Sequence, residues 1–377
     1  MLSIGENTLG IGCAIMLSLS ARGEVWTHTN KPAATSPAIS ADGSVFVVGG
    51  GTATYVSYDY GTTWRSNNFR GSAVALSANG TNIIVASPGA VYTSGDAGLT
   101  WTTQGNPPTF GPFNNPRQIA SASDGSRLAF VLYGTCPIFT STDGGATWST
   151  NNDAPVKYWT GIASSADGRR LAAGSADGIW ISTNSGMNWF SALASNAVVV
   201  ASTADGKRLV ASGNNQVYLS SDFGATWSSQ EILNMYASAA SSSADGTRLG
   251  LSCYFGIFMS TNSGVTWSNA NVGALGWDSL AESADGHRWM AHSGGSGALF
   301  IGASAPAPVL QIAPTNANVS ISWAVPSSPF VLQQRASVDG GNRTTVAEPV
   351  VMNPNTLRNE VSVAASNSCC FFRLSSP

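Results

Sequence analysis

Charged residues are scarce in this sequence. Asp, Glu, Lys and Arg make up 10% of the 377 residues and leave a formal net charge of −3, whereas a typical soluble domain has about 25% charged residues. With only 17 Lys and Arg there is no basic run, so we expect no nucleic-acid partner. No apolar stretch reaches the roughly 18 residues of a membrane-spanning helix, so we expect no transmembrane segment.

Cysteine and histidine are also sparse. The five cysteines are odd in number and show no CxxC or Cys/His spacing, which excludes a disulfide framework and a zinc site. The three histidines, His28, His287 and His292, are scattered, and there is no GxSxG elbow or phosphate loop. We therefore expect no metal and no cofactor.

The N-terminus carries a short apolar run. Leu9 to Leu19 is followed by the small residues Ser20 and Ala21, a pattern that predicts a secretory signal peptide over residues 1–21. Glu6 and the lack of Lys or Arg in the first eight residues argue for the alternative, an ordinary buried segment. The first interpretation implies a secreted, cell-surface or periplasmic protein.

Two short motifs recur along the chain. The motif Ser-x-Asp/Asn-x-Gly-x-x-Trp occurs six times and ends at Trp64, Trp101, Trp148, Trp189, Trp227 and Trp267. Its acidic or amide position, occupied by Asp59, Asp96, Asp143, Asn184, Asp222 and Asn262, suits a side chain that accepts backbone N–H bonds across a tight turn.

The second motif, Ser/Thr-Ala-Asp-Gly or a close variant, occurs seven times, at Asp42, Asn79, Asp124, Asp167, Asp205, Asp245 and Asp285. Asp-Gly or Asn-Gly between apolar runs is a strong hairpin signal. Together the motifs give four strands in each repeat of about 40 residues, which is the pattern of a propeller blade. We therefore predict an all-β, seven-bladed β-propeller over residues 22–305.

The seventh repeat lacks the Trp-containing motif. Trp26 lies one repeat length before Trp64 and is in register with it. We predict that the strand 24–29 pairs with the strand 298–303 and closes the ring, because closure removes exposed sheet edges.

The first motif resembles the hairpin of the BNR/Asp-box family, which includes sialidases, xyloglucanases, sortilin-type receptors and photosystem II assembly factors of the Ycf48/HCF136 kind. The resemblance implies a propeller, but it does not imply one function. Residues 306–377 have alternating strands and resemble a fibronectin-III-like module of bacterial secreted proteins. We therefore expect a small β-sandwich-like domain there.

Few acidic residues are left for catalysis. Ten of the 14 Asp lie in the two turn motifs, which leaves Asp153, Glu231 and Asp278 as weak catalytic candidates. Glycoside hydrolysis requires a matched pair of carboxylates. The sialidase pattern also requires three arginines, and only Arg70 and Arg117 are in suitable loops, so that activity is not expected.

Large side chains gather where the inner strands leave the face made by the loops. The candidate ligand-binding residues are Arg70, Phe113, Arg117, Tyr158, Trp159, Tyr236, Tyr254 and Trp277, with Phe110, Tyr133, Phe255 and His292 on nearby loops. Aromatic and arginine groups around a channel mouth suit a sugar or peptide ligand; alternatively, they pack the loops between blades.

These residues favour a non-catalytic, monomeric propeller that binds a glycan or a protein on its loop face. One alternative is a glycoside hydrolase of the sialidase or xyloglucanase kind. A second alternative, based on the resemblance alone, is an assembly factor of the Ycf48/HCF136 kind.

Overall fold

The computed structural model contains only strands, turns and loops in the part of the chain that it describes. The described residues of the propeller are 25–29, 34–104, 115–150, 154–213, 215–232, 236–273 and 275–304. Those of the C-terminal unit are 311–315, 318–324, 331–335, 344–346, 351–353, 358–364 and 371–375. The predicted signal peptide over residues 1–21 lies outside the described residues.

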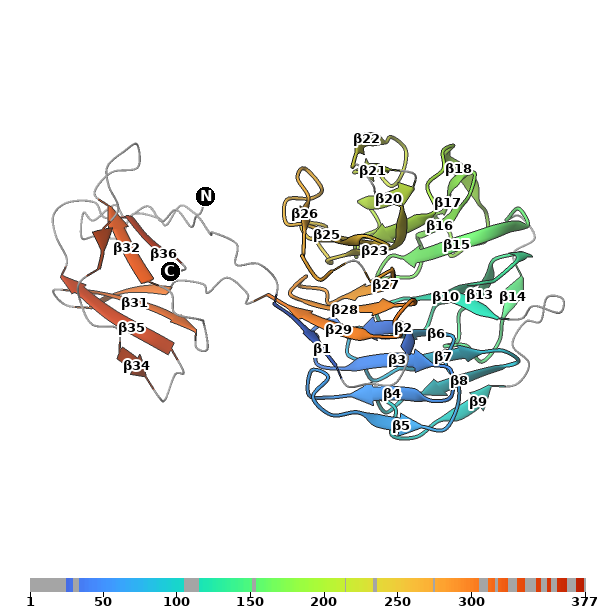
Figure 1. Cartoon of the computed structure of the whole chain (residues 1–377), viewed down its shortest axis with the longest axis horizontal. Coiled ribbons are helices and arrows are strands. Elements are labelled where there is room, and N and C mark those ends of the chain that lie inside the picture. Colours follow the sequence, from blue (N-terminus) through green and yellow to red (C-terminus); the bar gives the residue numbers. More distant parts are fainter. Residues whose placement is uncertain are drawn as a thin grey trace. The chain divides into compact units, whose positions relative to one another are not determined.

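The first unit, Glu24–Ala303, has seven four-stranded antiparallel sheets (Figure 1). Blade 1 has β2 (Ala34–Ile39), β3 (Phe46–Gly50), β4 (Thr54–Ser57) and β5 (Arg65–Asn67). Blade 2 has β6 (Ala73–Leu76), β7 (Ile83–Ser87), β8 (Ala90–Ser94) and β9 (Thr102–Gln104). Blade 3 has β10 (Pro116–Ser121), β11 (Leu128–Leu132), β13 (Phe139–Ser141) and β14 (Ser149–Thr150).

Blade 4 has β15 (Lys157–Ser164), β16 (Leu171–Ser175), β17 (Gly178–Ser182) and β18 (Phe190–Leu193), and the short β12 (Thr135–Cys136) is added beside β15. Blade 5 has β19 (Val199–Ser202), β20 (Leu209–Gly213), β21 (Gln216–Ser220) and β22 (Ser228–Glu231). Blade 6 has β23 (Ala237–Ser242), β24 (Leu249–Cys253), β25 (Gly256–Ser260) and β26 (Ser268–Asn269). Blade 7 has β27 (Trp277–Glu282), β28 (Arg288–Ser293), β29 (Leu299–Ala303) and β1 (Val25–His28).

The N-terminal strand completes blade 7, as the sequence predicted. β1 pairs antiparallel with β29, with Trp26 opposite Gly302. Each blade's first strand is its innermost strand and contacts the innermost strand of the next blade, and β27 of blade 7 contacts β2 of blade 1. The seven-bladed, all-β propeller is therefore confirmed.

A circle of backbone hydrogen bonds joins the blades beside the Asp-Gly turns. In each blade the residue before the turn Asp or Asn donates its N–H to the carbonyl of the corresponding residue in the next blade. The seven N···O distances are 2.7 to 2.9 Å, and the seven residues are Ala41, Ala78, Ser123, Ala166, Ala204, Ala244 and Ala284. Ala284 donates back to Ala41, so the circle has no open end.

The Trp-containing turns, called Asp-boxes here, share one hydrogen-bond pattern. In the box of blade 3, Asp143 accepts from Ser141 and from both the backbone N–H and the hydroxyl of Thr147. In the box of blade 1, the Trp64 indole N–H donates to the Gly61 carbonyl at 3.0 Å. The residue after the Asp or Asn has positive φ in every box, for example 59° at Tyr60.

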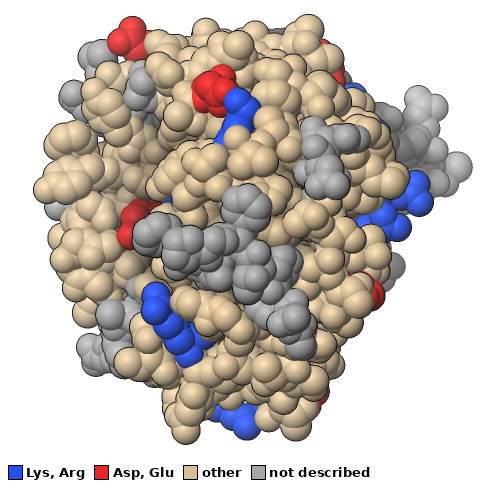
Figure 2. All heavy atoms as spheres, turned by 90° about the vertical axis from the view of Figure 1, so that its right-hand side faces the viewer, with Lys and Arg blue, Asp and Glu red and all other residues tan. Residues whose placement is uncertain are grey.

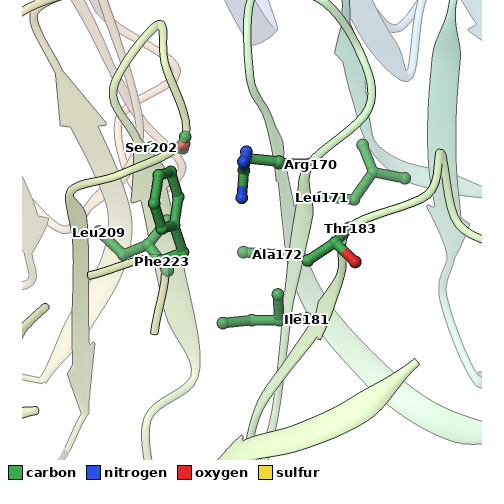
Figure 3. A pocket seen from close by; sticks show the side chains of 9 residues that line it. Arg170, Leu171, Ala172, Ile181, Thr183, Ser202, Leu209 and Phe223 are labelled. Carbon is green, nitrogen blue, oxygen red and sulfur yellow. The ribbon is translucent and has the colours of Figure 1, made fainter. Parts of the chain in front are cut away.

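Asp-Gly turns and Asp-boxes lie on one face of the propeller, the turn face, where neighbouring blades also meet. Figure 3 shows the junction of blades 4 and 5, where Arg170 points toward Phe223. The Arg170 guanidinium carbon lies 3.8 Å from the centre of the Phe223 ring. Arg288 of blade 7 lies at the same distance over Tyr60 of blade 1. Such contacts help to fix the angle between neighbouring blades.

The C-terminal unit contains two antiparallel sheets. One has the order β30 (Gln311–Thr315), β31 (Asn318–Ala324), β35 (Arg358–Ala364), β34 (Val351–Asn353). The other has the order β33 (Thr344–Thr345), β32 (Val331–Arg335), β36 (Phe371–Ser375). Ile321 and Val361, which are paired across β31 and β35, are buried. The fibronectin-III-like character of this unit stays a prediction.

Candidate functional site

The loops between the second and third strands of each blade, together with the loops between blades, form the face opposite the turn face, called the loop face here. Figure 2 views the propeller from this side and shows few charged residues among a large uncharged surface. Phe110, Phe113 and Asp153, which the sequence placed on this face, lie outside the described residues.

β-Bulges occur near the start of several innermost strands, at their loop-face ends. Five innermost strands have an extra residue just after their first paired residue, namely Thr35, Arg117, Thr160, Ser238 and Asp278. A bulge locally redirects a strand and re-aims a side chain. Of these five residues only Arg117 and Asp278 are charged. Arg117 therefore gives blade 3 a positive charge at this position, and Asp278 gives blade 7 a negative one.

Arg117 lies at the centre of a polar and aromatic cluster. Its Nε–H donates to the Thr160 carbonyl at 2.9 Å, and its Nη1 donates to the Tyr158 hydroxyl at 3.3 Å. The guanidinium carbon lies 4.9 Å from the centre of the Tyr133 ring and 5.6 Å from that of Tyr158. Both rings remain accessible, with 45% and 47% of their surface exposed. The structure thus brings together Arg117 and Tyr158, which the sequence had proposed, with Tyr133.

The strand β12 helps to position this cluster. It lies in the loop between β11 and β13 of blade 3 and pairs with the start of β15 in blade 4, so that Thr135 stands opposite Tyr158. Beside it, Lys157 forms an ion pair with Asp177, and this contact, aided by a hydrogen bond from Ser175, holds the pKa of Asp177 below its usual range. Asp177 is therefore ionised at neutral pH and paired.

Trp159 and Trp277 do not contribute to the loop-face surface. Trp159 is fully buried and its indole N–H donates to the Cys136 carbonyl at 3.0 Å. Trp277 is 1% exposed and donates to the Gly273 carbonyl at 2.9 Å. A buried ring offers no face to a ligand, so the ligand-contacting role expected of these two residues is corrected to one of packing between blades. In both strands the bulge residue, Thr160 or Asp278, directly follows the Trp.

The other predicted ligand-binding residues are exposed but separate. Arg70 lies between blades 1 and 2, Tyr236 lies between blades 5 and 6, and Tyr254 lies in blade 6 in edge contact with Phe255. Tyr236 and Tyr254 have 59% and 65% of their surface exposed. Within the described residues, no hydrogen bond or ring contact joins them to Arg117.

The remaining carboxylate candidates do not form a catalytic pair. Glu231 lies on β22, the outermost strand of blade 5, whereas Asp278 lies on β27, the innermost strand of blade 7. Three strand spacings of about 4.8 Å already separate the outermost from the innermost strand of one blade, a total of about 14 Å. Glycosidases hold their carboxylates about 5 to 9.5 Å apart.

Asp278 instead contacts a histidine that the sequence had noted only as a nearby loop residue. The Asp278 Oδ1 to His292 Nδ1 distance is 2.8 Å, and His292 is 4% exposed. Its Nε2 atom is buried and has no hydrogen-bond partner within the described residues. Strand pairing could have predicted this Asp278–His292 contact from the sequence, because His292 stands opposite Ser279, the neighbour of Asp278.

The described residues contain no group of three or more His, Cys, Asp or Glu side chains that could hold a metal ion. The described part of the chain also contains no helix long and apolar enough to cross a membrane.

Comparison with known proteins agrees with the propeller architecture. The solved structure titled "YCF48 bound to D1 peptide" is 14% identical, with a TM-score of 0.57, over 76% of this chain and 98% of that one. The β-propeller domain of Cps50 (Swd1) from Myceliophteria thermophila is 13% identical, with a TM-score of 0.58, over 74% of this chain and 99% of that one. At these identities the likeness shows the fold alone.

No curated protein matches this chain. The resemblance to the BNR/Asp-box family stays a prediction, since the matching family is a different one. The family model described as the DUF6242 beta propeller domain matches residues 15–249, which is more than half of the chain, and the chain therefore belongs to that family.

Proposed function

We propose that this propeller is a non-catalytic module that binds an acidic segment of a partner protein on its loop face. The observation that carries the proposal is the position of Arg117, near the start of the innermost strand β10, between the half-exposed rings of Tyr133 and Tyr158. The bonds to Thr160 and Tyr158 orient the guanidinium and leave N–H groups of Nη1 and Nη2 for a ligand. A fork of N–H donors matches a carboxylate.

The chemistry around Arg117 favours a polypeptide over a glycan. The groups offered to a ligand are cationic N–H donors and tyrosine rings, whereas the two Trp rings expected to stack on a sugar are buried. Tyrosine and arginine are the residues that most often dominate protein interfaces. The solved propeller Ycf48 is bound to a peptide in the structure named above, which supports the choice of a peptide ligand here.

The test is selection of ligands from a random peptide library against the full chain, followed by affinity measurement. We expect acidic peptides, and we expect Arg117→Ala to weaken them at least about tenfold because a charge-assisted hydrogen bond is lost. Arg117→Lys restores only part of the affinity, since lysine lacks the planar fork. Arg169→Ala, which removes an exposed arginine on the turn face, is the matched control and leaves affinity unchanged.

Two results would contradict the proposal. One is a set of selected peptides that bind the Arg117→Ala chain as tightly as the unaltered chain. The other is a parallel glycan array in which ligands bind through Arg117 while no peptide does, which would assign the site to a carbohydrate.

A further inference from the structure

A groove lies where the ring closes, between the outer strand of blade 7 and the Asp-box of blade 1. It measures about 470 Å³, which is within the usual range of ligand sites, about 300 to 1,000 Å³. One wall consists of residues 27–29, the other of Tyr60, Thr62 and Trp64 with the box glycine, and Ile301 contributes from β29. None of the described residues that line it is Asp, Glu, Lys or Arg. The groove therefore favours an uncharged ligand, because its lining offers no opposite charge to pair with one.

Three threonines line the groove, and each donates its hydroxyl proton to a backbone carbonyl. Thr27 and Thr29 donate to carbonyls of β29 at 3.3 and 3.2 Å, and Thr62 donates to the Asp59 carbonyl at 2.8 Å. A carbonyl oxygen can only accept, so these protons are committed, and each hydroxyl oxygen keeps lone pairs for another donor. A ligand that bonds to these hydroxyls must therefore bring O–H or N–H donors of its own.

Thr62 distinguishes the Asp-box of blade 1 from the others. In the other five boxes the residue after the box glycine is apolar, namely Leu99, Ala146, Met187, Ala225 and Val265. The turn itself thus does not require a hydroxyl at this position. Among the six boxes, the one that has a hydroxyl here is the one that lies opposite Thr27 and Thr29.

Tyr60 adds an aromatic surface to the same wall. The Arg288 guanidinium carbon lies 3.8 Å from the centre of its ring, and Tyr60 still has 47% of its surface exposed. A pyranose carries O–H donors around its edge and C–H bonds on its faces. It therefore matches a groove that combines hydrogen-bond acceptors with an exposed aromatic ring, which is itself partly apolar and partly polar.

We infer that this closing groove is a second binding site and that it takes a neutral saccharide. The sugar hydroxyls donate to Thr27, Thr29 and Thr62, and a face of the sugar ring packs against Tyr60. The site goes beyond the loop-face proposal, because it shares no residue with the Arg117 cluster and takes no acidic ligand. A peptide backbone, which brings N–H donors, is the competing ligand.

The test titrates the ¹⁵N-labelled full chain with neutral hexasaccharides of β-glucan, α-glucan, xylan, mannan and chitin at millimolar concentration. The readout is the indole N–H resonance of Trp64, which donates to the Gly61 carbonyl at 3.0 Å in the groove wall and is assigned by Trp64→Phe. We expect at least one hexasaccharide to shift this resonance. Blocked triglycine, which has backbone N–H donors but no hydroxyls, should leave it in place.

Deoxyfluoro analogues of the bound sugar test the direction of the hydrogen bonds. Fluorine replaces a hydroxyl at similar size but donates no proton. We therefore expect at least one analogue to bind about three- to tenfold more weakly than the parent sugar, the loss for one neutral hydrogen bond.

Thr62→Val gives the matched variant, since blade 6 already has Val265 at the same position and the exchange removes a hydroxyl at nearly constant volume. We expect it to weaken sugar binding about three- to tenfold. Thr27→Val does the same on the opposite wall and serves if the first variant fails to fold. Val265→Thr makes the reverse exchange away from the groove and leaves the titration unchanged.

Four results would each overturn the inference. No hexasaccharide shifts the Trp64 resonance, or triglycine shifts it as the sugars do. Alternatively, every deoxyfluoro analogue binds as tightly as its parent sugar, or Thr62→Val and Thr27→Val both keep full affinity.

Discussion

At the scale of single residues, one carboxyl departs from the repeat. Glu282 stands three residues before the turn aspartate Asp285, where other blades have Ile, Leu or Ser. Its Oε2 accepts from the Ser241 hydroxyl at 2.7 Å, while its Oε1 is buried. Burial raises the pKa of Glu282 to about 8, although Arg248 nearby favours the charged form.

This raised pKa predicts a pH-dependent stability. Between about pH 4.5 and about pH 8 the unfolded chain has lost the Glu282 proton while the folded chain retains it, so the free energy of unfolding falls as pH rises. The slope from this group is at most about 1.4 kcal/mol per pH unit. Denaturant unfolding at several pH values should show that Glu282→Gln removes this slope.

The control for that measurement is Glu231→Gln, which changes an exposed carboxylate on the outer strand of blade 5. It should leave the pH profile as in the unaltered chain. A Glu282→Gln chain whose stability falls with pH as steeply as the unaltered chain would show that the carboxyl is already ionised.

The Asp-box aspartates allow a second prediction at this scale. Asp143→Ala removes the acceptor for Ser141 and Thr147, and we expect the melting temperature to fall by about 2 to 4 °C, the shift for roughly 1 kcal/mol. Asp143→Asn should cost less, because Asn184 and Asn262 accept the same backbone bond in their own boxes. Equal losses for both variants would show that the charge, rather than the turn geometry, is what matters.

At the scale of elements, the strand that closes the ring is supplied from the far end of the propeller sequence. β1 pairs with β29 over four residues, and Trp26 packs near Trp289 with ring centres 6.3 Å apart. A β-carbon on Gly302 would lie 2.8 Å from the Trp26 ring, so the strand fits its place closely. Without β1, the edge of β29 would be exposed, and an exposed edge is a template for pairing with other chains.

We therefore predict that a chain lacking residues 1–29 self-associates and melts at a lower temperature. A synthetic peptide of residues 24–31 should bind it and restore the monomer, as judged by light scattering and thermal melting. The same peptide with Trp26 replaced by Ala should do so less well. A truncated chain that stays monomeric and equally stable without peptide would contradict the role given to β1.

The elements were easier to predict from sequence than the site. The spacing of Trp26 and Trp64 indicated the closing strand, because hairpin turns and their tryptophans obey local rules that repeat in every blade. The direction of Trp159 and Trp277 was not predictable in the same way. One bulge residue changes which side of the strand the following side chains face. The five bulges lie at the same position of the repeat, but the residue types there, Thr, Arg, Ser and Asp, do not mark a bulge in the sequence. Arg117 also occupies a bulge, but the sequence identified it as a ligand-binding candidate because it is an arginine.

At the scale of the whole propeller, the two faces are built differently. The turn face is joined by the circle of seven backbone hydrogen bonds and by contacts such as Arg170 on Phe223. The loop face carries Arg117 and the exposed Tyr133, Tyr158, Tyr236 and Tyr254. The contacts that join the blades and the proposed Arg117 site therefore lie on opposite faces, and turn-face variants should change stability more than binding at Arg117.

The hydrogen-bonded circle also bears on how such a chain can change its size over evolutionary time. Because each turn uses one donor toward one neighbour and one acceptor toward the other, the circle has no position reserved for a first or last repeat. Gain or loss of a whole repeat by gene duplication or deletion leaves every donor matched, whereas gain or loss of a partial repeat leaves a donor and an acceptor unpaired. The number of blades can therefore change only by whole repeats, whereas the lengths of the loops on the other face are not constrained in this way.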